Sequence, residues 1–218
     1  MKKRIILTIA LLLVYTVFIA GCTSNTPSST PSAVASRTTS STPSPIPTTQ
    51  SQLSTIDPSQ MALTLSEVPA GFILKEGTPL TFSDASQTSL ANGWEKGYNA
   101  EFDRSIPVAG SIIPDIEVIQ QYISVYPINN VNQVITQGGT KVLQSANATF
   151  KVEQLSDPKI GDFSQAYKLN YNLKNEQISG FIIYFAKKDV VESFIMQGTS
   201  ADYSTLDNLA NIAEAKVK

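Results

Sequence analysis

Alternation of apolar and polar side chains dominates several long stretches of this chain and sets what it can fold into. Over residues 116–126, Ile119, Ile123 and Val125 fall on one side of an extended backbone, and Tyr122 and Tyr126 fall on the other. A period of two residues is typical of a strand that lies in a sheet. The same alternation over 94–103 and 164–173 predicts that a β-sheet is the main element of the fold.

Helical periodicity is confined to two longer segments. One helix is predicted from Asn129 or Asn130 to about Ser145, and Gly138-Gly139 inside it favours a break or kink. Capping-box spacing predicts that a second helix opens at Ser204.

The predicted order of elements is strand, short helix, two long strands, helix, four strands and helix. Hairpins outnumber strand–helix alternations, which indicates an α+β fold. We predict a mainly antiparallel sheet of about six or seven strands. The two longer helices are expected to pack on one face, which would leave the other face partly open. Within 94–103, Trp94 is expected on the same side as Ala100 and Phe102.

The N-terminal residues have the pattern of an export signal. Lys2-Lys3-Arg4 precedes an apolar run over 5–20, which is short for a bilayer-spanning helix of about 20 residues and fits a secretory signal peptide. Ile19-Ala20-Gly21-Cys22 follows, and it resembles the lipobox of prokaryotic lipoproteins, with isoleucine in place of the usual leucine. The resemblance implies cleavage before Cys22 and lipid attachment through its thiolate. An uncleaved anchor helix is the alternative.

A low-complexity linker follows over 23–56. Of its 34 residues, 24 are Ser, Thr or Pro, and none is aromatic, so it buries too little apolar surface to offset its ordering entropy. We therefore predict a signal peptide over 1–21, a lipidated cysteine and disordered stalk over 22–56, and a single extracytoplasmic α+β domain over 57–218.

Composition excludes several kinds of chemistry. The chain has no histidine and one cysteine, which excludes Ser-His-Asp and Cys-His catalysis, imidazole zinc sites and an internal disulfide. Loss of the three leader bases would leave 13 of the 16 basic side chains against 18 acidic ones. An acidic surface argues against nucleic acid as a partner. We expect no cofactor, no metal and no catalytic residue.

Carboxylates are the remaining candidates for catalysis or metal binding. Glu101 and Asp103, with Glu95, fall on one strand face, where paired carboxylates serve glycoside hydrolysis, although a solvated strand face has the same pattern.

A second carboxylate group surrounds the turn at 156–162. Glu153, Asp157 and Asp162 could approach a Ca²⁺ ion there, but their spacing is ordinary for a turn. Asn147-Ala148-Thr149 is a candidate N-glycosylation site.

Three tyrosines are the candidate binding surface. Tyr122, Tyr126 and Tyr184 are expected to share the sheet face away from the helices, where tyrosine supplies amphipathic contact area. Packing under the loop at 105–114 is the alternative. Trp94 is expected in the core.

A second resemblance concerns the C-terminal half. "KIGDFSQAY" before a strand, a "KKDVV" turn and a helix of "LDNLANIAEAKV" type are similar to sensor-type or Mog1/PsbP-like domains of envelope lipoproteins. The resemblance implies an α+β fold, and the disulfides of some such sensor domains are absent.

These patterns together favour one function and leave two others open. We expect a lipid-anchored module on the outer side of the cell membrane that binds or senses an unknown ligand or envelope protein, without catalysis. An envelope hydrolase that uses carboxylates and a structural cell-wall or surface-layer spacer are the alternatives.

Overall fold

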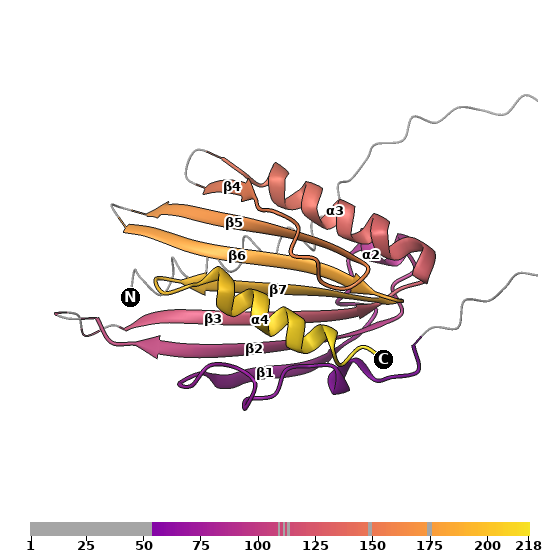
Figure 1. Ribbon diagram of the computed structural model, residues 1–218, viewed down its shortest axis with the longest axis horizontal. Helices are drawn as coiled ribbons and strands as arrows, with labels where there is room; N and C mark the ends of the chain where they lie inside the picture. The colour runs from indigo at the N-terminus through magenta and orange to yellow at the C-terminus, as the bar shows by residue number, and fades with distance from the viewer. Residues whose placement is uncertain (1–53, 109, 111, 113, 148–149, 174–175) are drawn as a thin grey trace, which may run out of the picture.

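A computed structural model (Figure 1) describes residues 54–218, apart from 109, 111, 113, 148, 149, 174 and 175. The strands within these residues are β1 (Ile73–Leu80), β2 (Lys96–Ile106), β3 (Asp115–Val125), β4 (Phe150–Gln154), β5 (Phe163–Leu173), β6 (Glu176–Lys187) and β7 (Val190–Gly198). The helices are α2 (Gln87–Ala91), α3 (Val131–Gln144) and α4 (Tyr203–Glu214), with 3₁₀ turns η1 (Pro58–Gln60) and η2 (Ile128–Asn130). This is the predicted order of elements.

The described strands form one antiparallel sheet in the order β1-β2-β3-β7-β6-β5-β4. The first three strands form a meander, and α3 then carries the chain to the far edge of the sheet. From there β4 to β7 return until β7 pairs with β3. The predicted fold class, α+β with an antiparallel sheet of about seven strands, is confirmed.

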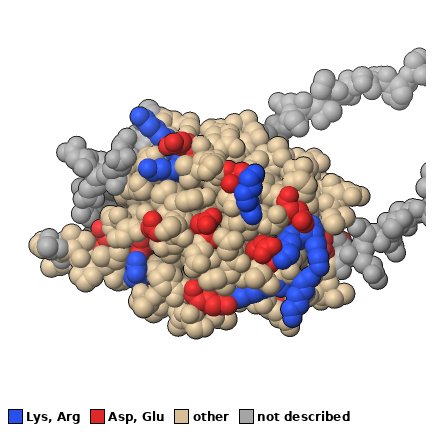
Figure 2. Space-filling model, in the orientation of Figure 1, with Lys and Arg blue, Asp and Glu red and all other residues tan. Residues whose placement is uncertain are grey.

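One face of this sheet packs against α4. Ile119 and Ile123 of β3 and Phe194 of β7 share a core cluster with Leu206 and Leu209 of α4. Figure 1 shows α4 lying across the front of the sheet. Acidic and basic side chains are interspersed over this side of the molecule, without a large basic area (Figure 2).

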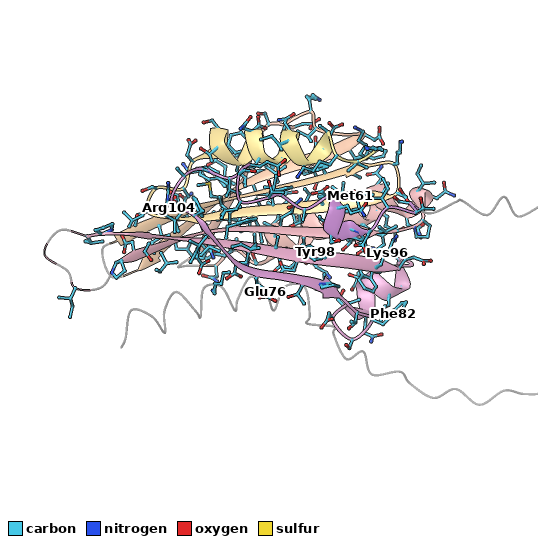
Figure 3. The ribbon with its side chains drawn as sticks, turned by 90° about the horizontal axis from the view of Figure 1, so that it is seen from below. Met61, Glu76, Phe82, Lys96, Tyr98 and Arg104 are labelled. Atoms are coloured by element: carbon cyan, nitrogen blue, oxygen red, sulfur yellow. The ribbon has the colours of Figure 1, made fainter. Side chains whose placement is uncertain are left out.

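The opposite face packs against α3. Ile182 and Tyr184 of β6 share a second cluster with Val131 and Ile135 of α3, whereas the intervening Ile183 belongs to the first cluster. Because successive side chains of a strand point to opposite faces, α3 and α4 lie on opposite sides of the sheet. The prediction that the two longer helices pack on one face is therefore wrong. Seen from below, α4 lies on one side of the sheet and Phe82, which leads into α2, lies on the other (Figure 3).

The α3 helix runs unbroken through Gly138-Gly139, contrary to the predicted break or kink. A Cβ at Gly139 would lie 2.1 Å from the Tyr167 hydroxyl, and a Cβ at Gly138 would lie 3.6 Å from the Tyr184 ring. Gly139 lets the helix backbone approach Tyr167, whereas a Cβ at Gly138 would make an ordinary contact with Tyr184. Tertiary packing offsets the unfavourable free energy of placing glycine in a helix, which is about 1 kcal/mol per residue relative to alanine.

Two local predictions need correction. The N-cap of α4 is Asp202, whose carboxylate accepts from the Thr205 backbone N–H and hydroxyl, both at 2.9 Å, so the helix does not open at Ser204. Hydrogen bonds from Ser204 and Thr205 lower the pKa of this carboxyl. Trp94 precedes β2 and packs in the second cluster, on the other side of the sheet from Phe102.

Two linked, buried hydrogen bonds lie on the α4 face of the sheet. The Leu63 backbone N–H donates to Gln121 Oε1 at 2.7 Å, and Gln121 Nε2 donates to Glu192 Oε2 at 2.6 Å. Glu192 is fully buried, and among the described residues its Oε1 has no hydrogen-bond partner. Burial raises the pKa of this carboxyl to about 8.

Candidate functional site

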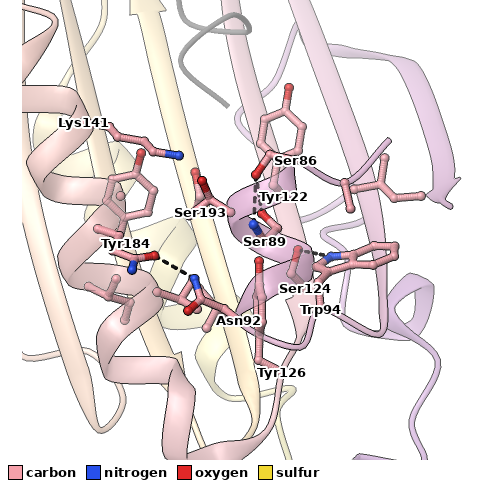
Figure 4. A pocket seen from close by; sticks show the side chains of 18 of the residues that line it. Ser86, Ser89, Asn92, Trp94, Tyr122, Ser124, Tyr126, Lys141, Tyr184 and Ser193 are labelled. Atoms are coloured by element: carbon pink, nitrogen blue, oxygen red, sulfur yellow. Dashed lines mark hydrogen bonds between the residues drawn. The ribbon is translucent and has the colours of Figure 1, made fainter. Parts of the chain in front are cut away.

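A pocket lies on the second face, where α2 and α3 meet the sheet. Its volume is about 140 Å³. The sheet supplies the floor, α3 supplies one wall, and α2 with the residues just before and after it supplies the other wall (Figure 4). A hollow of this size is comparable with the ~150 Å³ of an apolar protein cavity that takes up benzene.

The floor is hollow because a small side chain lies between two tyrosines. Ser193 of β7 is paired with Tyr122 of β3 on one side and with Tyr184 of β6 on the other. All three line the pocket. A serine between two rings leaves unfilled the volume that a larger residue would occupy.

Aromatic and hydroxyl groups close the side next to α2. Trp94 Nε1 donates to Ser124 Oγ at 3.2 Å, which fixes the indole against β3. Burial raises the pKa of the Tyr126 hydroxyl. Side-chain hydrogen bonds with Ser89 and Ser124 partly counteract this rise in pKa. Ser89 is in turn held by Ser86, whose Oγ accepts from the Ser89 backbone N–H at 3.0 Å. This wall is therefore a connected network rather than a set of free side chains.

The α3 wall presents one stripe of the helix. Val134, Gln137, Gly138 and Lys141 follow a three- or four-residue spacing and line the pocket together. Gln137 Oε1 accepts from Asn92 Nδ2 at 2.7 Å, which ties α3 to the end of α2. The helix pair is thereby held over the floor.

Three polar groups of the pocket have no partner among the described residues. The Tyr184 hydroxyl and Ser193 Oγ are buried without a hydrogen bond, and their residues are 4% and 5% exposed. Burial raises the pKa of the Tyr184 phenol, and the neighbouring tyrosines add to this. Lys141 forms no ion pair within the described part of the chain. Buried hydroxyls are normally satisfied, so those of Tyr184 and Ser193 point to something that the pocket binds. Lys141 is half-buried and is available to a ligand, but its exposure does not require one.

The structure brings together all three tyrosines singled out from the sequence. Tyr122, Tyr126 and Tyr184 line this one pocket. They do not lie on an open face away from the helices, because α2 and α3 cover them, and Tyr126 and Tyr184 are each 4% exposed. Nor do they pack under the loop at 105–114, which joins β2 to β3 at the opposite end of the sheet (Figure 1).

Sequence reasoning missed the polar half of the site. Ser193 and Lys141 carried no signal in the sequence, since neither belongs to a motif. Trp94 was expected in the core; it is 5% exposed, and it also forms part of the pocket wall.

The carboxylates considered for glycoside hydrolysis are bound to a lysine. Lys75 Nζ lies 2.6 Å from Glu101 Oε1 and 3.1 Å from Asp103 Oδ2, and Gln120 Nε2 donates to Glu101 Oε2 at 2.6 Å. Burial raises the pKa of Asp103, while Lys75 counteracts this shift. Glu95 precedes β2 and is exposed. These side chains form an ion-paired cluster on the sheet rather than an acid–base pair facing a cleft.

The turn considered for Ca²⁺ also has internal partners. Asp157 Oδ2 pairs with Lys159 Nζ at 2.6 Å, and hydrogen bonds from Lys159 and Ser164 lower the pKa of Asp157 to about 2. Asp162 Oδ2 accepts from the Lys188 backbone N–H at 2.8 Å. Glu153 is exposed. Within the described residues no cluster of three or more acidic, histidine or cysteine side chains could hold a metal.

Two further sequence candidates concern covalent modification. Asn147 is exposed directly after α3, but Thr149 of its sequon lies outside the described residues. Cys22, the predicted signal peptide and nearly all of the predicted stalk also lie outside them. No helix in the described ranges is long and apolar enough to cross a membrane.

Comparison with known proteins gives a likeness in fold alone. Neither a search of protein-family models nor a search of curated proteins finds a match. The fold is similar to that in the crystal structure of the extracellular domain of PknH from Mycobacterium tuberculosis, with a TM-score of 0.54 and 10% sequence identity. The similarity covers 72% of this chain and 93% of that domain.

Proposed function

We propose that this protein is a lipid-anchored extracytoplasmic module that binds a small ligand and does not act on it chemically. The observation that carries the proposal is the pocket between α2, α3 and the sheet. Its floor contains two buried hydroxyls that have no hydrogen-bond partner among the residues that the structure describes. A concave, largely apolar site with a few convergent polar groups is the usual form of a small-molecule site.

The position outside the membrane is supported by the first 56 residues and by the fold. Removal of a signal peptide over 1–21 would leave Cys22 as the new N-terminus with its lipid, and the stalk to residue 56 would hold the domain away from the bilayer. The likeness in fold to the extracellular domain of PknH fits this arrangement.

The chemistry of the pocket favours binding over catalysis. Ser86 and Ser89 hydrogen-bond to each other at 2.9 Å, Ser124 accepts from Trp94, and Ser193 has no partner in the described structure. A serine nucleophile needs an adjacent general base, and none of these hydroxyls bonds to one. The hydrolase alternative also lacks support, because Lys75 binds both of its carboxylates.

A fragment screen with a filled pocket tests the proposal. Ser193→Leu places a larger side chain between Tyr122 and Tyr184, and Thr140→Leu makes a similar enlargement on the exposed outer side of α3. We expect ligand-observed NMR to find single-ring fragments that bind the wild type and Thr140→Leu but not Ser193→Leu. If no fragment binds the wild type, or if the same fragments bind Ser193→Leu, the pocket is not the functional site.

A further inference from the structure

We infer that the ligand is a small aromatic monocarboxylate, with its ring among Trp94, Tyr122 and Tyr126 and its carboxylate at Lys141, Ser193 and Tyr184. This inference rests on the proposed function and adds the chemical class of the ligand.

The aromatic ring of the inferred ligand is supported by the size and the lining of the pocket. The cavity of about 140 Å³ is close to the ~150 Å³ that accommodates a benzene molecule. Aromatic side chains prefer edge-to-face or offset contacts with another ring, and Trp94 already makes such a contact with Phe82, at 5.5 Å between centroids and 81° between planes. The volume therefore admits one additional ring, and Trp94, Tyr122 and Tyr126 are the aromatic side chains that line the space beside it.

The charge follows from the two ionisable lining residues other than tyrosine. The Asp84 carboxylate is occupied, because its Oδ2 accepts from the Thr81 backbone N–H at 2.8 Å and from the Thr81 hydroxyl at 2.6 Å. Lys141 forms no ion pair in the described structure. Lys141 lies in the last turn of α3, where a positive charge interacts favourably with the helix dipole. That interaction does not explain why the side chain lines the pocket. The hydrogen bonds from Thr81 lower the pKa of Asp84, so this carboxylate stays ionised and is turned to its own loop. The unpaired ammonium group of Lys141 is the charged group that the lining offers to a ligand, and it would attract an anion.

The two hydroxyls favour a carboxylate over other anions. Ser193 and Tyr184 are adjacent across β6 and β7, and each can donate one hydrogen bond. In Figure 4 the Lys141 amine and the Ser193 hydroxyl lie between the rings of Tyr184 and Tyr122. Two neutral donors and one cation satisfy the two oxygens of a carboxylate. A phosphate carries more charge and a third oxygen, for which the pocket offers no second cation.

Isothermal titration of the full chain with benzoate and with benzamide tests this assignment. The two probes have nearly the same shape, but only benzoate is charged. We expect benzoate to bind about tenfold more tightly, as is typical of a charge-assisted hydrogen bond. Lys141→Gln should weaken benzoate binding until the two probes bind about equally, because glutamine has no charge to attract the carboxylate. Glutamine has a similar helix propensity, so α3 should stay intact. Lys151→Gln, at an exposed position on β4, is the matched control and should keep the preference.

The possible failures are distinguishable. If the wild type binds the two probes equally, or if Lys141→Gln retains the preference for benzoate, the carboxylate assignment is wrong while binding at the pocket stands. If neither probe binds but other single-ring fragments do, the ligand class is wrong. If benzoate binds Ser193→Leu as tightly as the wild type, the site lies elsewhere, and the proposed function falls with the inference.

Discussion

Replacing Glu192 by glutamine should remove most of the pH dependence of this protein's stability near neutral pH. Glu192 lies on the α4 face of β7, fully buried, where it accepts one hydrogen bond from Gln121 Nε2. Burial raises the pKa of its carboxyl from an ordinary value of 4.5 to about 8. The folded protein therefore holds a neutral carboxylic acid at pH 7, and glutamine is a close isostere of that form.

The size of the effect follows from the two pKa values. A carboxyl whose pKa is higher in the folded state than in the unfolded state contributes its full stability below the unfolded pKa. That contribution is lost as the pH rises toward the folded pKa. Because each pKa unit is worth ~1.36 kcal/mol, the free energy of unfolding of the wild type should fall by roughly 4 kcal/mol between pH 4.5 and 8. No imidazole titrates in this pH range, because the chain has no histidine.

Urea unfolding followed at several pH values between 4.5 and 9 measures the effect. We expect the unfolding free energy of wild type to fall across this range and that of Glu192→Gln to stay nearly level. Glu153→Gln, which changes an exposed carboxylate on β4, should behave like wild type. A wild type whose stability is constant from pH 5 to 8, or an equal fall in Glu192→Gln, would refute the reasoning.

Four further changes have expected outcomes. Cys22→Ser should leave the protein soluble or as uncleaved precursor in membrane fractionation, and normal processing with retained detergent partitioning would contradict the lipid anchor. A chain beginning at Asp57 should melt cooperatively, independently of reducing agent, because it contains no cysteine; a broad, non-cooperative melt would contradict the domain boundary. Gly138→Ala should stabilise the protein slightly and Gly139→Ala should destabilise it in calorimetry, because only the second Cβ collides with a buried tyrosine hydroxyl; the reverse order would contradict the packing. Tyr126→Ala should cost about 3 kcal/mol of stability, as large-to-small changes of buried aromatic residues do, whereas an unchanged melting temperature would show that the side chain is not packed.

The strands and helices were predictable because their signals are local. Alternation fixed β3 and β5, and the apolar stripe of α4 matches its buried residues Leu206, Leu209 and Ala213. The side of the sheet on which each helix packs is not a local property. The run "ISGFIIYFA" did carry the relevant signal, since a strand that is apolar on both faces needs a cover on both.

The aromatic half of the site was predictable, but its polar half was not. Tyrosines two and four residues apart on a strand share a face, so Tyr122 and Tyr126 could be grouped from sequence. Tyr184, Ser193 and Lys141 meet them only through the register of β3, β7 and β6 and through the position of α3. The continuity of α3 through its two glycines also depends on tertiary packing, which overrides helix propensity.

The fluorescence of Trp94 tests the central claim most directly. It is the single tryptophan of the chain, and it lines the pocket, so its emission reports on that site alone. If the pocket binds ligands, titrating the full chain with single-ring fragments should give a saturable change in emission that Ser193→Leu abolishes and Thr140→Leu preserves. An emission that no fragment changes, or a change that persists in Ser193→Leu, would contradict the claim.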